Sequence, residues 1–481
     1  MSSTKDKIRH RNIELQELSN EEQISKSNTI ELIPAQQVPI TGKQIIPDFD
    51  YDSDDFEYPE GGKKAWTVVF GCFLGLIACF GLLNTTGIIE TYLENHQLHN
   101  EKSSTIGWVF SLMNFICCAS CIFSGTYFDR NGFKVPVIIG TILQVVGLSG
   151  TANSTKLWHF ILSFSTICGF GNGILISPLV SAPAHYFKRK RGTATALATV
   201  GGSVGGGIFP LMLKKFFELK SSNNPYYGFM WGIRSLAFIN LTLLILSISL
   251  ANERISFIDT NDRKINEPQW KYVTRIYILE SFDMKAFKDL RYSFCVFGTS
   301  LGELSLICVV TYYGSYVMSQ GLSQSDAYML IMVINLTGIL GRWIPGRLSD
   351  SFGRFNVAIS TLAMLSAVMF IGWYPFGTNL QNLYVISASY GFFSGSILSL
   401  LPVCCSQISK TEEFGRRYST MYFCVGIVML IGVPITGAII GTKSYTDYQN
   451  YKIFCGVTTI ASALCFAISH YFAVGLKLIK F

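Results

Sequence analysis

Long apolar segments alternate with short polar connections over most of this 481-residue chain, which predicts membrane-spanning helices. Crossing a bilayer core takes roughly 20 helical residues, and twelve segments are long and apolar enough to do so. They lie at residues 65–87, 105–127, 134–152, 157–180, 193–214, 228–250, 291–318, 325–346, 355–375, 380–403, 418–440 and 451–475. The predicted fold class is therefore an all-α membrane protein with twelve transmembrane helices.

One longer polar stretch divides the twelve segments into two sets of six. Residues 251–290 carry several charges and Pro268, and we interpret them as a linker. The predicted organisation is then a tail at 1–62, a six-helix bundle at 63–250, the linker, and a second six-helix bundle at 291–481. The tail has no apolar run and carries six basic against thirteen acidic residues, so we expect it to be disordered and solvated.

A short motif occurs once in each predicted bundle. Gly125–Gly132 and Gly346–Gly353 both have the spacing G-x-x-x-D-x-x-G, 221 positions apart. Both copies lie where one apolar segment ends and the next begins, and two glycine-rich runs, at 169–173 and 391–395, keep nearly the same offset. A repeat at this period within hydrophobic segments is typical of two homologous membrane bundles, so we predict two pseudo-symmetric halves.

Composition and cysteine placement agree with a lipid environment. The chain is 49% hydrophobic and only 14% charged, whereas soluble proteins average about 25% charged residues. All 13 cysteines fall in apolar segments. There they act as small packing residues, and their spacing indicates neither a disulfide framework nor a metal site.

Basic residues concentrate in the loops of one side. The connections after the second, fourth, eighth and tenth segments carry Lys and Arg, for example at Lys188–Arg191. The opposite loops are poor in basic residues, except around Lys214, Lys215 and Lys220. The positive-inside rule then predicts that the basic connections, the linker and both termini are cytosolic.

We interpret the duplicated motif as a gate. Asp129 and Asp350 end the second and eighth segments, where a carboxylate can meet the positive N-terminal end of a neighbouring helix and a nearby arginine. The arginines in or beside the motif are Arg130, Arg347 and Arg354. A single copy could merely anchor a loop at the membrane surface, but two copies at matching positions favour a latch that breaks during alternating access.

Two six-helix halves with this loop resemble the major facilitator superfamily, and the resemblance covers nearly everything after the tail. Glu60–Trp66 is similar to the [D/E]-G-G-x-x-x-W signature of its monocarboxylate porter family, and Tyr186–Ala194 is similar to that family's fifth-helix signature. Runs such as Gly71–Ile77 and Pro402–Gly415 resemble the fungal branch and, within it, the riboflavin transporters. The resemblance implies facilitated uptake of riboflavin across the plasma membrane by alternating access.

The residues leave two other functions open. A proton-coupled monocarboxylate symporter would have the same fold, and a transporter-like nutrient receptor would signal through the tail. The animal carboxylate porters carry an Asp at the position of Gly338 and an essential Lys at the position of Asn84. Loss of both groups weakens the case for carboxylate symport, and Asn84 offers the neutral donors and acceptors that a polar uncharged substrate needs. Alternatively, Asn84 only hydrogen-bonds helices together.

Few ionisable groups lie deep inside the predicted spans. We single out Glu303 in the seventh segment and Arg342 in the eighth. A charge at the bilayer centre costs about 2.5–3.5 kcal/mol, so each needs a partner or contact with water. We predict that they pair beside the substrate pathway, either as a switchable pair or as a permanent ion pair that only stabilises packing.

Aromatic and small residues mark two further segments. Tyr312 and Tyr313 close the seventh segment and are predicted to stack on a flat heterocyclic substrate, whereas Tyr316 fits an interfacial aromatic belt. Glycines in the fifth segment have small-x-x-x-small spacing, which favours close helix contacts that slide. They are Gly201, Gly202, Gly205, Gly206 and Gly207.

Enzymatic chemistry is poorly supported. No phosphate-binding G-x-x-x-x-G-K-[ST] sequence is present, the six histidines are scattered, and the glycine-rich runs do not follow a strand. We therefore expect no enzyme activity, no catalytic residue, no metal and no cofactor. The expected partners are a small-molecule substrate and the lipid bilayer, without nucleic acid, and we expect the chain to act as a monomer.

Overall fold

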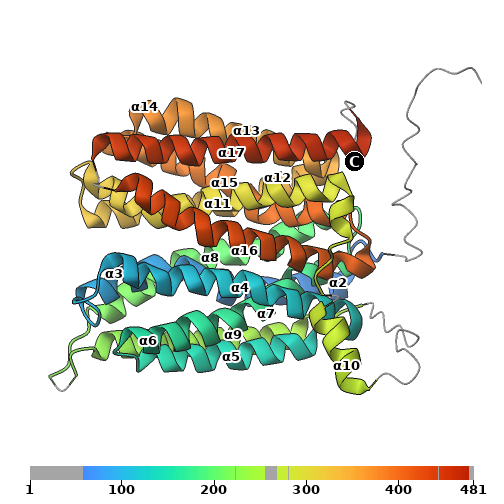
Figure 1. The fold of residues 1–481 in the computed structure, drawn as a ribbon, viewed down its shortest axis with the longest axis horizontal. Coiled ribbons are helices and arrows are strands. Elements are labelled where there is room, and N and C mark those ends of the chain that lie inside the picture. Colours follow the sequence, from blue (N-terminus) through green and yellow to red (C-terminus); the bar gives the residue numbers. More distant parts are fainter. Residues whose placement is uncertain (1–57, 223, 255–267, 280, 442–443, 476–481) are drawn as a thin grey trace, which may run out of the picture. The chain divides into compact units, whose positions relative to one another are not determined.

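The computed structural model describes residues 58–222, 224–254, 268–279, 281–441 and 444–475. Within these ranges, twelve helices are long and apolar enough to cross a membrane, and Figure 1 shows them side by side. The predicted all-α membrane fold class with twelve transmembrane helices is thereby confirmed. The predictions for the tail before residue 58 and for linker residues 255–267 lie outside the described residues.

The first six spans form one bundle, drawn in blue to green in Figure 1. Its first span is interrupted, because α2 (Gly62–Asn84) ends at Asn84 and α3 (Thr86–Asn95) begins two residues later. The fourth span contains a π-helix, η1 (Ile161–Cys168), between α6 (Leu157–Phe160) and α7 (Gly169–Ser181). The other four spans are α4 (Ser103–Asn131), α5 (Lys134–Ala152), α8 (Arg191–Phe217) and α9 (Tyr227–Leu250).

The last six spans form a second bundle, coloured yellow to red in Figure 1. The ninth span of the chain, which is the third of this bundle, is again irregular. It consists of α13 (Arg354–Ala367), the π-helix η5 (Val368–Trp373) and α14 (Tyr374–Phe376) in succession. The other five are α11 (Leu290–Ser319), α12 (Gln324–Phe352), α15 (Leu380–Gln407), α16 (Phe414–Ile440) and α17 (Tyr445–Val474). A short helix, α10 (Gln269–Thr274), continued by η3 (Arg275–Leu279), precedes this bundle.

Glycines set the distance between α8 and α2, because a residue without a side chain lets two backbones approach. A Cβ added at Gly205 would lie 2.5 Å from the carbonyl oxygen of Ile77, and one added at Gly81 would lie 2.9 Å from Gly205 Cα. A Cβ at Gly201 would likewise overlap the backbone of α2. Gly207 differs from the close packing predicted for this helix, since a Cβ there would have nothing within 4 Å.

Two pairs of helices make the most extensive contacts between the bundles, α4 with α16 and α8 with α12. We call them the α4/α16 seam and the α8/α12 seam. In the α8/α12 seam the helices run antiparallel along their full length. Asp350 bonds Thr193 at one end, and Lys214 lies 5.6 Å from the ring of Tyr328 at the other. The boundary between the two halves of the chain therefore runs between the helices of these two pairs.

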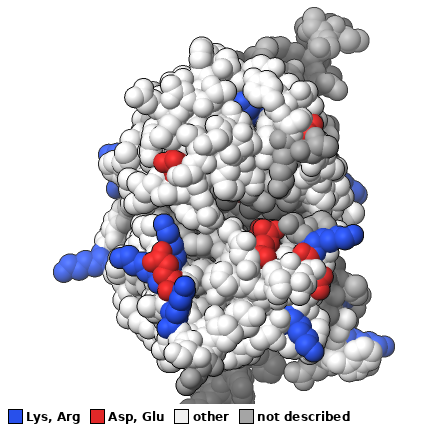
Figure 2. Space-filling view, turned by 90° about the vertical axis from the view of Figure 1, so that its left-hand side faces the viewer, with Lys and Arg blue, Asp and Glu red and all other residues white. Residues whose placement is uncertain are grey.

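The end of the molecule that carries α3 and α14 differs between the two bundles. Figure 2 shows charged side chains gathered over the lower half of that face, which belongs to the first bundle, and few over the upper half. Lys214, Lys215 and Lys220, the basic exceptions in the sequence, all belong to the first bundle. The charge asymmetry at this end is thus a property of one bundle and not of the whole face.

Candidate functional site

Asp350, the acidic residue of the second motif copy, joins the two bundles at the N-terminus of α8. Its Oδ1 accepts the N–H of Gly192 at 2.8 Å, and its Oδ2 accepts the N–H and the hydroxyl of Thr193 at 2.8 and 2.6 Å. A helix N-terminus presents unpaired N–H groups and positive potential, and both favour a carboxylate. The contact closes the α8/α12 seam at this end.

Asp129, the acidic residue of the first motif copy, makes the equivalent contact in the α4/α16 seam. Its Oδ1 accepts the N–H of Gly415 at 3.0 Å, and its Oδ2 accepts the N–H of Arg416 at 2.8 Å. Both N–H groups belong to the first turn of α16. The two copies therefore bind the N-termini of matching helices in opposite bundles, which is the geometry that a latch requires.

The glycines of the motif lie where the seams are tightest and where the chain turns. A Cβ added at Gly346 would overlap the Cβ of Ala196, and one added at Gly125 would overlap the backbone of α16. The last glycine of each copy ends its helix with a positive φ, 93° at Gly132 and 92° at Gly353. Other residues rarely adopt this conformation. The first glycine of each copy therefore allows close helix packing, and the last one allows the chain to turn.

The three arginines predicted to take part in gating differ in position. Arg354 is buried, and its Nη2 donates to the carbonyl oxygen of Lys188 at 2.5 Å, in the loop that precedes α8. Arg347 is exposed, and Arg130 is half-buried at the end of α4. Arg354 therefore reinforces the contact that Asp350 makes at the same end of the α8/α12 seam.

The two family signatures noted in the sequence contact each other. The carboxylate of Glu60 accepts the backbone N–H groups of three successive loop residues, 188–190, at 2.7, 2.5 and 3.1 Å. The ring of Trp66 lies 4.9 Å from that of Phe187. Three donors on one carboxylate fix the loop before α8, and the loop in turn places the N–H groups that Asp350 binds.

Thr411 is a further point at which the bundles meet at this end, and sequence reasoning missed it. Its Oγ1 lies 2.7 Å from the hydroxyl of Tyr58, in the segment that precedes α2. Arg191 Nη2 donates to the same oxygen at 3.1 Å, and Arg191 Nη1 donates to the carbonyl oxygen of Ser406 at 3.1 Å. Arg191, interpreted from the sequence only as a loop charge, is buried and bridges the two bundles.

The described end of the linker contacts both bundles beside Asp129. The hydroxyl of Tyr277 in η3 accepts a hydrogen bond from Asn131 Nδ2 at 2.5 Å. Asp283 Oδ2 lies 3.3 Å from Arg416 Nη2 in the second bundle. Arg416 is therefore held twice, by Asp129 through its backbone N–H and by Asp283 through its guanidinium.

Glu303 and Arg342 are both 3% exposed, but no ion pair joins them within the described part of the chain. Arg342 Nη1 instead donates to the carbonyl oxygen of Thr199 across the α8/α12 seam, and Glu303 Oε1 accepts the hydroxyl of Tyr422 at 3.1 Å. The predicted direct pair is thus not formed in this conformation, because each group has a nearer polar partner on another helix. Arg342 Nε is buried without a hydrogen-bond partner among the described residues, so the guanidinium keeps a free donor.

Asn84 is the last residue of α2, at the interruption of the first span. Its Nδ2 donates to the carbonyl oxygen of Phe80 at 2.9 Å and to that of Gly202 at 3.4 Å. The side chain therefore does link α2 with α8, as the packing interpretation requires. It is only half-buried, however, and discontinuous helices are common at transporter substrate sites. Both interpretations of Asn84 are compatible with this position.

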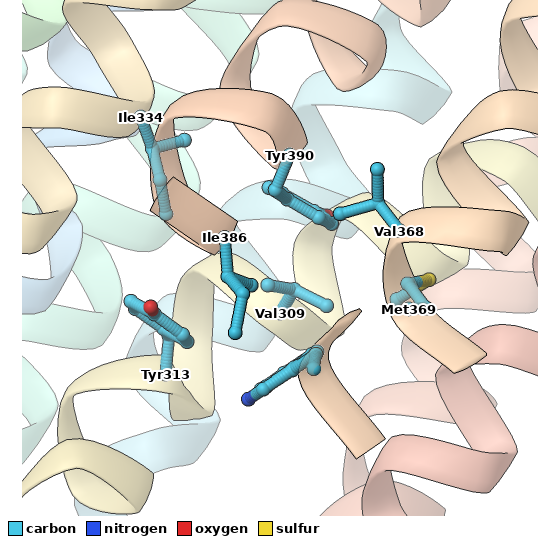
Figure 3. Close-up of a pocket in the computed structure, with 8 residues that line it drawn as sticks. Val309, Tyr313, Ile334, Val368, Met369, Ile386 and Tyr390 are labelled. Atoms are coloured by element: carbon cyan, nitrogen blue, oxygen red, sulfur yellow. The ribbon is translucent and has the colours of Figure 1, made fainter. Parts of the chain in front are cut away.

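The two tyrosines predicted to contact substrate have different surroundings. Tyr312 is half-buried and donates to the carbonyl oxygen of Val433 at 3.2 Å. Tyr313 is buried, and its hydroxyl lies 2.6 Å from Ser387 Oγ. Figure 3 shows Tyr313 beside a gap inside the second bundle, which has no room for a water-sized molecule. In this conformation Tyr313 is not placed to stack on a substrate.

Tyr316 lies in the interior of the second bundle, so its predicted place in an interfacial belt is wrong. It is 1% exposed and donates to the carbonyl oxygen of Gly377 at 2.6 Å. The Nζ of Lys452 lies 4.8 Å from the centre of its ring and donates to the carbonyl oxygens of Trp373 and Tyr374 at 3.3 and 3.4 Å. Lys452 is an ionisable group within a span that sequence reasoning overlooked, and it binds the carbonyls at the end of η5.

The cysteines form no disulfide and no metal-binding group within the described part of the chain. All 13 cysteines are free, and Cys118, Cys424 and Cys465 are the half-buried ones. Among the described residues, no group of three or more His, Cys, Asp or Glu side chains could hold a metal ion.

Comparisons with known proteins agree with this architecture. The model of the Major Facilitator Superfamily matches residues 71–433 and 344–473. The chain is 62% identical over 438 residues to Riboflavin transporter MCH5 of Saccharomyces cerevisiae, covering 90% of this chain and 84% of that protein. It is 31% identical over 427 residues to MFS-type transporter 1 of an Ophiocordyceps species, covering 89% of this chain and 90% of that protein.

Solved structures show the same fold at low identity. The proton:xylose symporter XylE has a TM-score of 0.66 and 14% identity, covering 86% of this chain and 96% of its own. The human organic anion transporter MFSD10 has a TM-score of 0.63 and 14% identity, covering 85% of this chain and all of its own. The family match spans both motif copies and both seams. The chain therefore belongs to the major facilitator superfamily and is a multi-pass membrane transporter.

Proposed function

We propose that this chain carries riboflavin across the plasma membrane by alternating access of its two bundles. The observation that carries the proposal is its 62% identity over 438 residues to Riboflavin transporter MCH5. Similarity at this level extends over nine-tenths of the chain and therefore includes the helices of both bundles. The solved structures, at 14% identity, support the fold and say nothing of the substrate.

The two seams supply the mechanism of the proposed transport. Asp129 and Asp350 hold both seams closed at one end, and breaking both contacts would let the bundles tilt apart there. From the basic loops we infer that this end of the bundles faces the cytosol, and the same rule predicts cytosolic termini. The structure then represents a conformation with its cytosolic gate closed. No hydrolysis or covalent step is needed, because a concentration gradient of the vitamin supplies the direction.

The interface favours an uncharged polar substrate over a carboxylate. Asn84 and Gly338 stand where the animal carboxylate porters carry a Lys and an Asp, so the cation and the acid of that chemistry are missing. Arg342 is the basic group nearest to these positions on α12, and its Nη1 is already engaged by Thr199. Polar amides at such a boundary suit the donors and acceptors of a neutral heterocycle.

Growth and uptake experiments test the proposed function. A riboflavin-auxotrophic yeast expressing this chain should grow at low vitamin concentration, and labelled riboflavin should enter independently of external pH. Entry of lactate that makes the medium more alkaline, without entry of riboflavin, would instead establish the monocarboxylate symporter. Entry of neither, together with loss of a transcriptional response on deletion of residues 1–60, would establish the nutrient receptor.

A further inference from the structure

Two asparagines from opposite bundles meet at Gly206 in the α8/α12 seam. A Cβ added at Gly206 would lie 2.8 Å from Asn335 Oδ1 and 2.9 Å from Asn84 Nδ2. Asn84 ends α2 in the first bundle, and Asn335 belongs to α12 in the second. The missing side chain of Gly206 is therefore what leaves room for both carboxamides at one point of the interface.

The hydrogen bonds of the two amides leave their oxygens open. Asn84 Nδ2 donates to the carbonyl oxygens of Phe80 and Gly202, and Asn335 Nδ2 donates to that of Ile331 at 3.1 Å. Since only the nitrogen of a carboxamide can donate to a carbonyl, these bonds fix which atom of each side chain is which. Neither Asn84 Oδ1 nor Asn335 Oδ1 accepts a hydrogen bond from a described residue. Both side chains are half-buried, so these acceptors can be reached by a ligand.

Asn335 lies on the same face of α12 as Arg342. Asn335 and Arg342 are seven residues apart, which places them on the same helix face about 10 Å from each other. Arg342 Nε is a donor without a described partner, and Gly338 lies between the two, with Ser203 Oγ 3.3 Å from its added Cβ. The Asp350 contact closes the seam beyond Arg342, so the asparagines lie on the side away from the closed gate.

We propose that Asn84 and Asn335 determine substrate specificity by reading an edge with an N–H flanked by carbonyl groups, which in a flavin is the imide of the pyrimidine ring. The inference rests on the proposed function. Asn335 Oδ1 accepts the substrate N–H, and the second hydrogen of Asn335 Nδ2 donates to a neighbouring substrate carbonyl. A carboxamide reads the donor–acceptor edge of adenine in the same bidentate way. Asn84 Oδ1, the open acceptor of the other bundle, shares the same N–H in a three-centre hydrogen bond, so binding draws the bundles together.

An analogue of the vitamin tests the proposal in the full-length transporter. Riboflavin methylated at the imide nitrogen has the same ring and sugar chain but no N–H to donate. Cells expressing the unmodified transporter should take it up about tenfold or more less efficiently than riboflavin, because an acceptor is left unpaired. Asn335→Ala should lower riboflavin uptake and bring the ratio between the two compounds close to one. Asn95→Ala should leave that ratio unchanged, since Asn95 is exposed and donates only to a carbonyl of its own helix.

Two neighbouring glycines provide a matched pair of variants. Gly206→Ala would place a methyl group within 3 Å of both amides, whereas an added Cβ at Gly207 has nothing within 4 Å. Riboflavin uptake per surface transporter should therefore fall in Gly206→Ala and stay unchanged in Gly207→Ala. Equal uptake of riboflavin and its methylated form by the unmodified transporter overturns the proposal, even if every variant fails to fold. Absence of any riboflavin uptake overturns the proposed function instead, so the two failures are distinguishable.

Discussion

Asp350 Oδ1 and the backbone nitrogen of Gly192 lie 2.8 Å apart, although the two residues belong to different bundles. The equivalent pair in the other seam, Asp129 and Gly415, lies 3.0 Å apart. In both cases a motif carboxylate binds the first turn of a helix in the opposite half. The repeat in the sequence therefore duplicates the acidic residue together with the helix N-terminus that receives it.

Removing the charge of Asp350 should shift the transporter toward opening at this end. Hydrogen bonds to a charged group contribute about 1.5–3 kcal/mol and neutral ones about 0.5–1.5, so a loss of about 1–1.5 kcal/mol in Asp350→Asn should favour the open state by roughly fivefold to tenfold. A cysteine at Ser177, which is buried and lies 3.0 Å from Ser419 Oγ across the interface, reports opening through maleimide labelling. The control is Asp326→Asn, in an exposed capping box of α12. Equal labelling in both backgrounds would contradict the latch.

A methyl group at Gly346 should block transport, and a second substitution should restore it. The added Cβ would overlap the Cβ of Ala196 in the opposite helix, so Gly346→Ala should force the α8/α12 seam apart. Gly346→Ala combined with Ala196→Gly should recover riboflavin uptake, because the methyl group gained on α12 is removed from the facing position on α8. Gly314→Ala is the control, since its nearest neighbour would lie 3.9 Å away. Failure of the rescue at normal surface expression would show that the glycine is needed for another reason.

Replacing Arg342 by Ala should abolish riboflavin uptake while the protein still reaches the cell surface. The guanidinium crosses the seam to Thr199 and is the buried charge nearest to the proposed pathway on α12. Arg342→Lys keeps the charge but loses the planar donor fork, so it should retain only part of the activity. Uptake is measured per surface transporter, with a fluorescent fusion as the expression readout. Full transport by Arg342→Ala would falsify a functional role and leave only packing.

Asp129 and Asp283 should act together on stability, because both hold Arg416. In purified protein, each of Asp129→Asn and Asp283→Asn should lower the thermal unfolding temperature. The change in the free energy of unfolding of the double variant should differ from the sum of the two single changes by at least about 0.5 kcal/mol. The pair Asp283 and Asp350 has no shared partner in the described contacts, so its effects should add. Additive behaviour of the first pair would show that the linker does not reinforce the Asp129 contact.

Much of the fold was predictable from the sequence because lipid imposes simple demands on a chain. Each span must be long, apolar and helical, so the twelve segments and their short connections follow from the pattern of hydrophobic residues. Asp129 and Asp350 could also be singled out from the sequence, because a motif repeated at matching positions is visible without any contact, and their gating role stays a prediction. The residues that donate to them, Gly192 and Gly415, could not be identified from the sequence, since every residue except proline has a backbone N–H.

The contacts between helices were decided only by the tertiary structure. Glu303 and Arg342 have opposite charges on consecutive helices, yet each bonds a residue far away in the chain. The sequence predicts an interfacial position for Tyr316 and does not single out Lys452, but both side chains are buried within the second bundle. The meeting of Asn84 with Asn335 depends on Gly206 of a third helix. The sequence by itself determined which residues are helical and in which solvent, because these are local properties. The sequence does not determine which helix faces line the boundary between the two bundles. That depends on side-chain packing between distant segments, which only the folded chain defines.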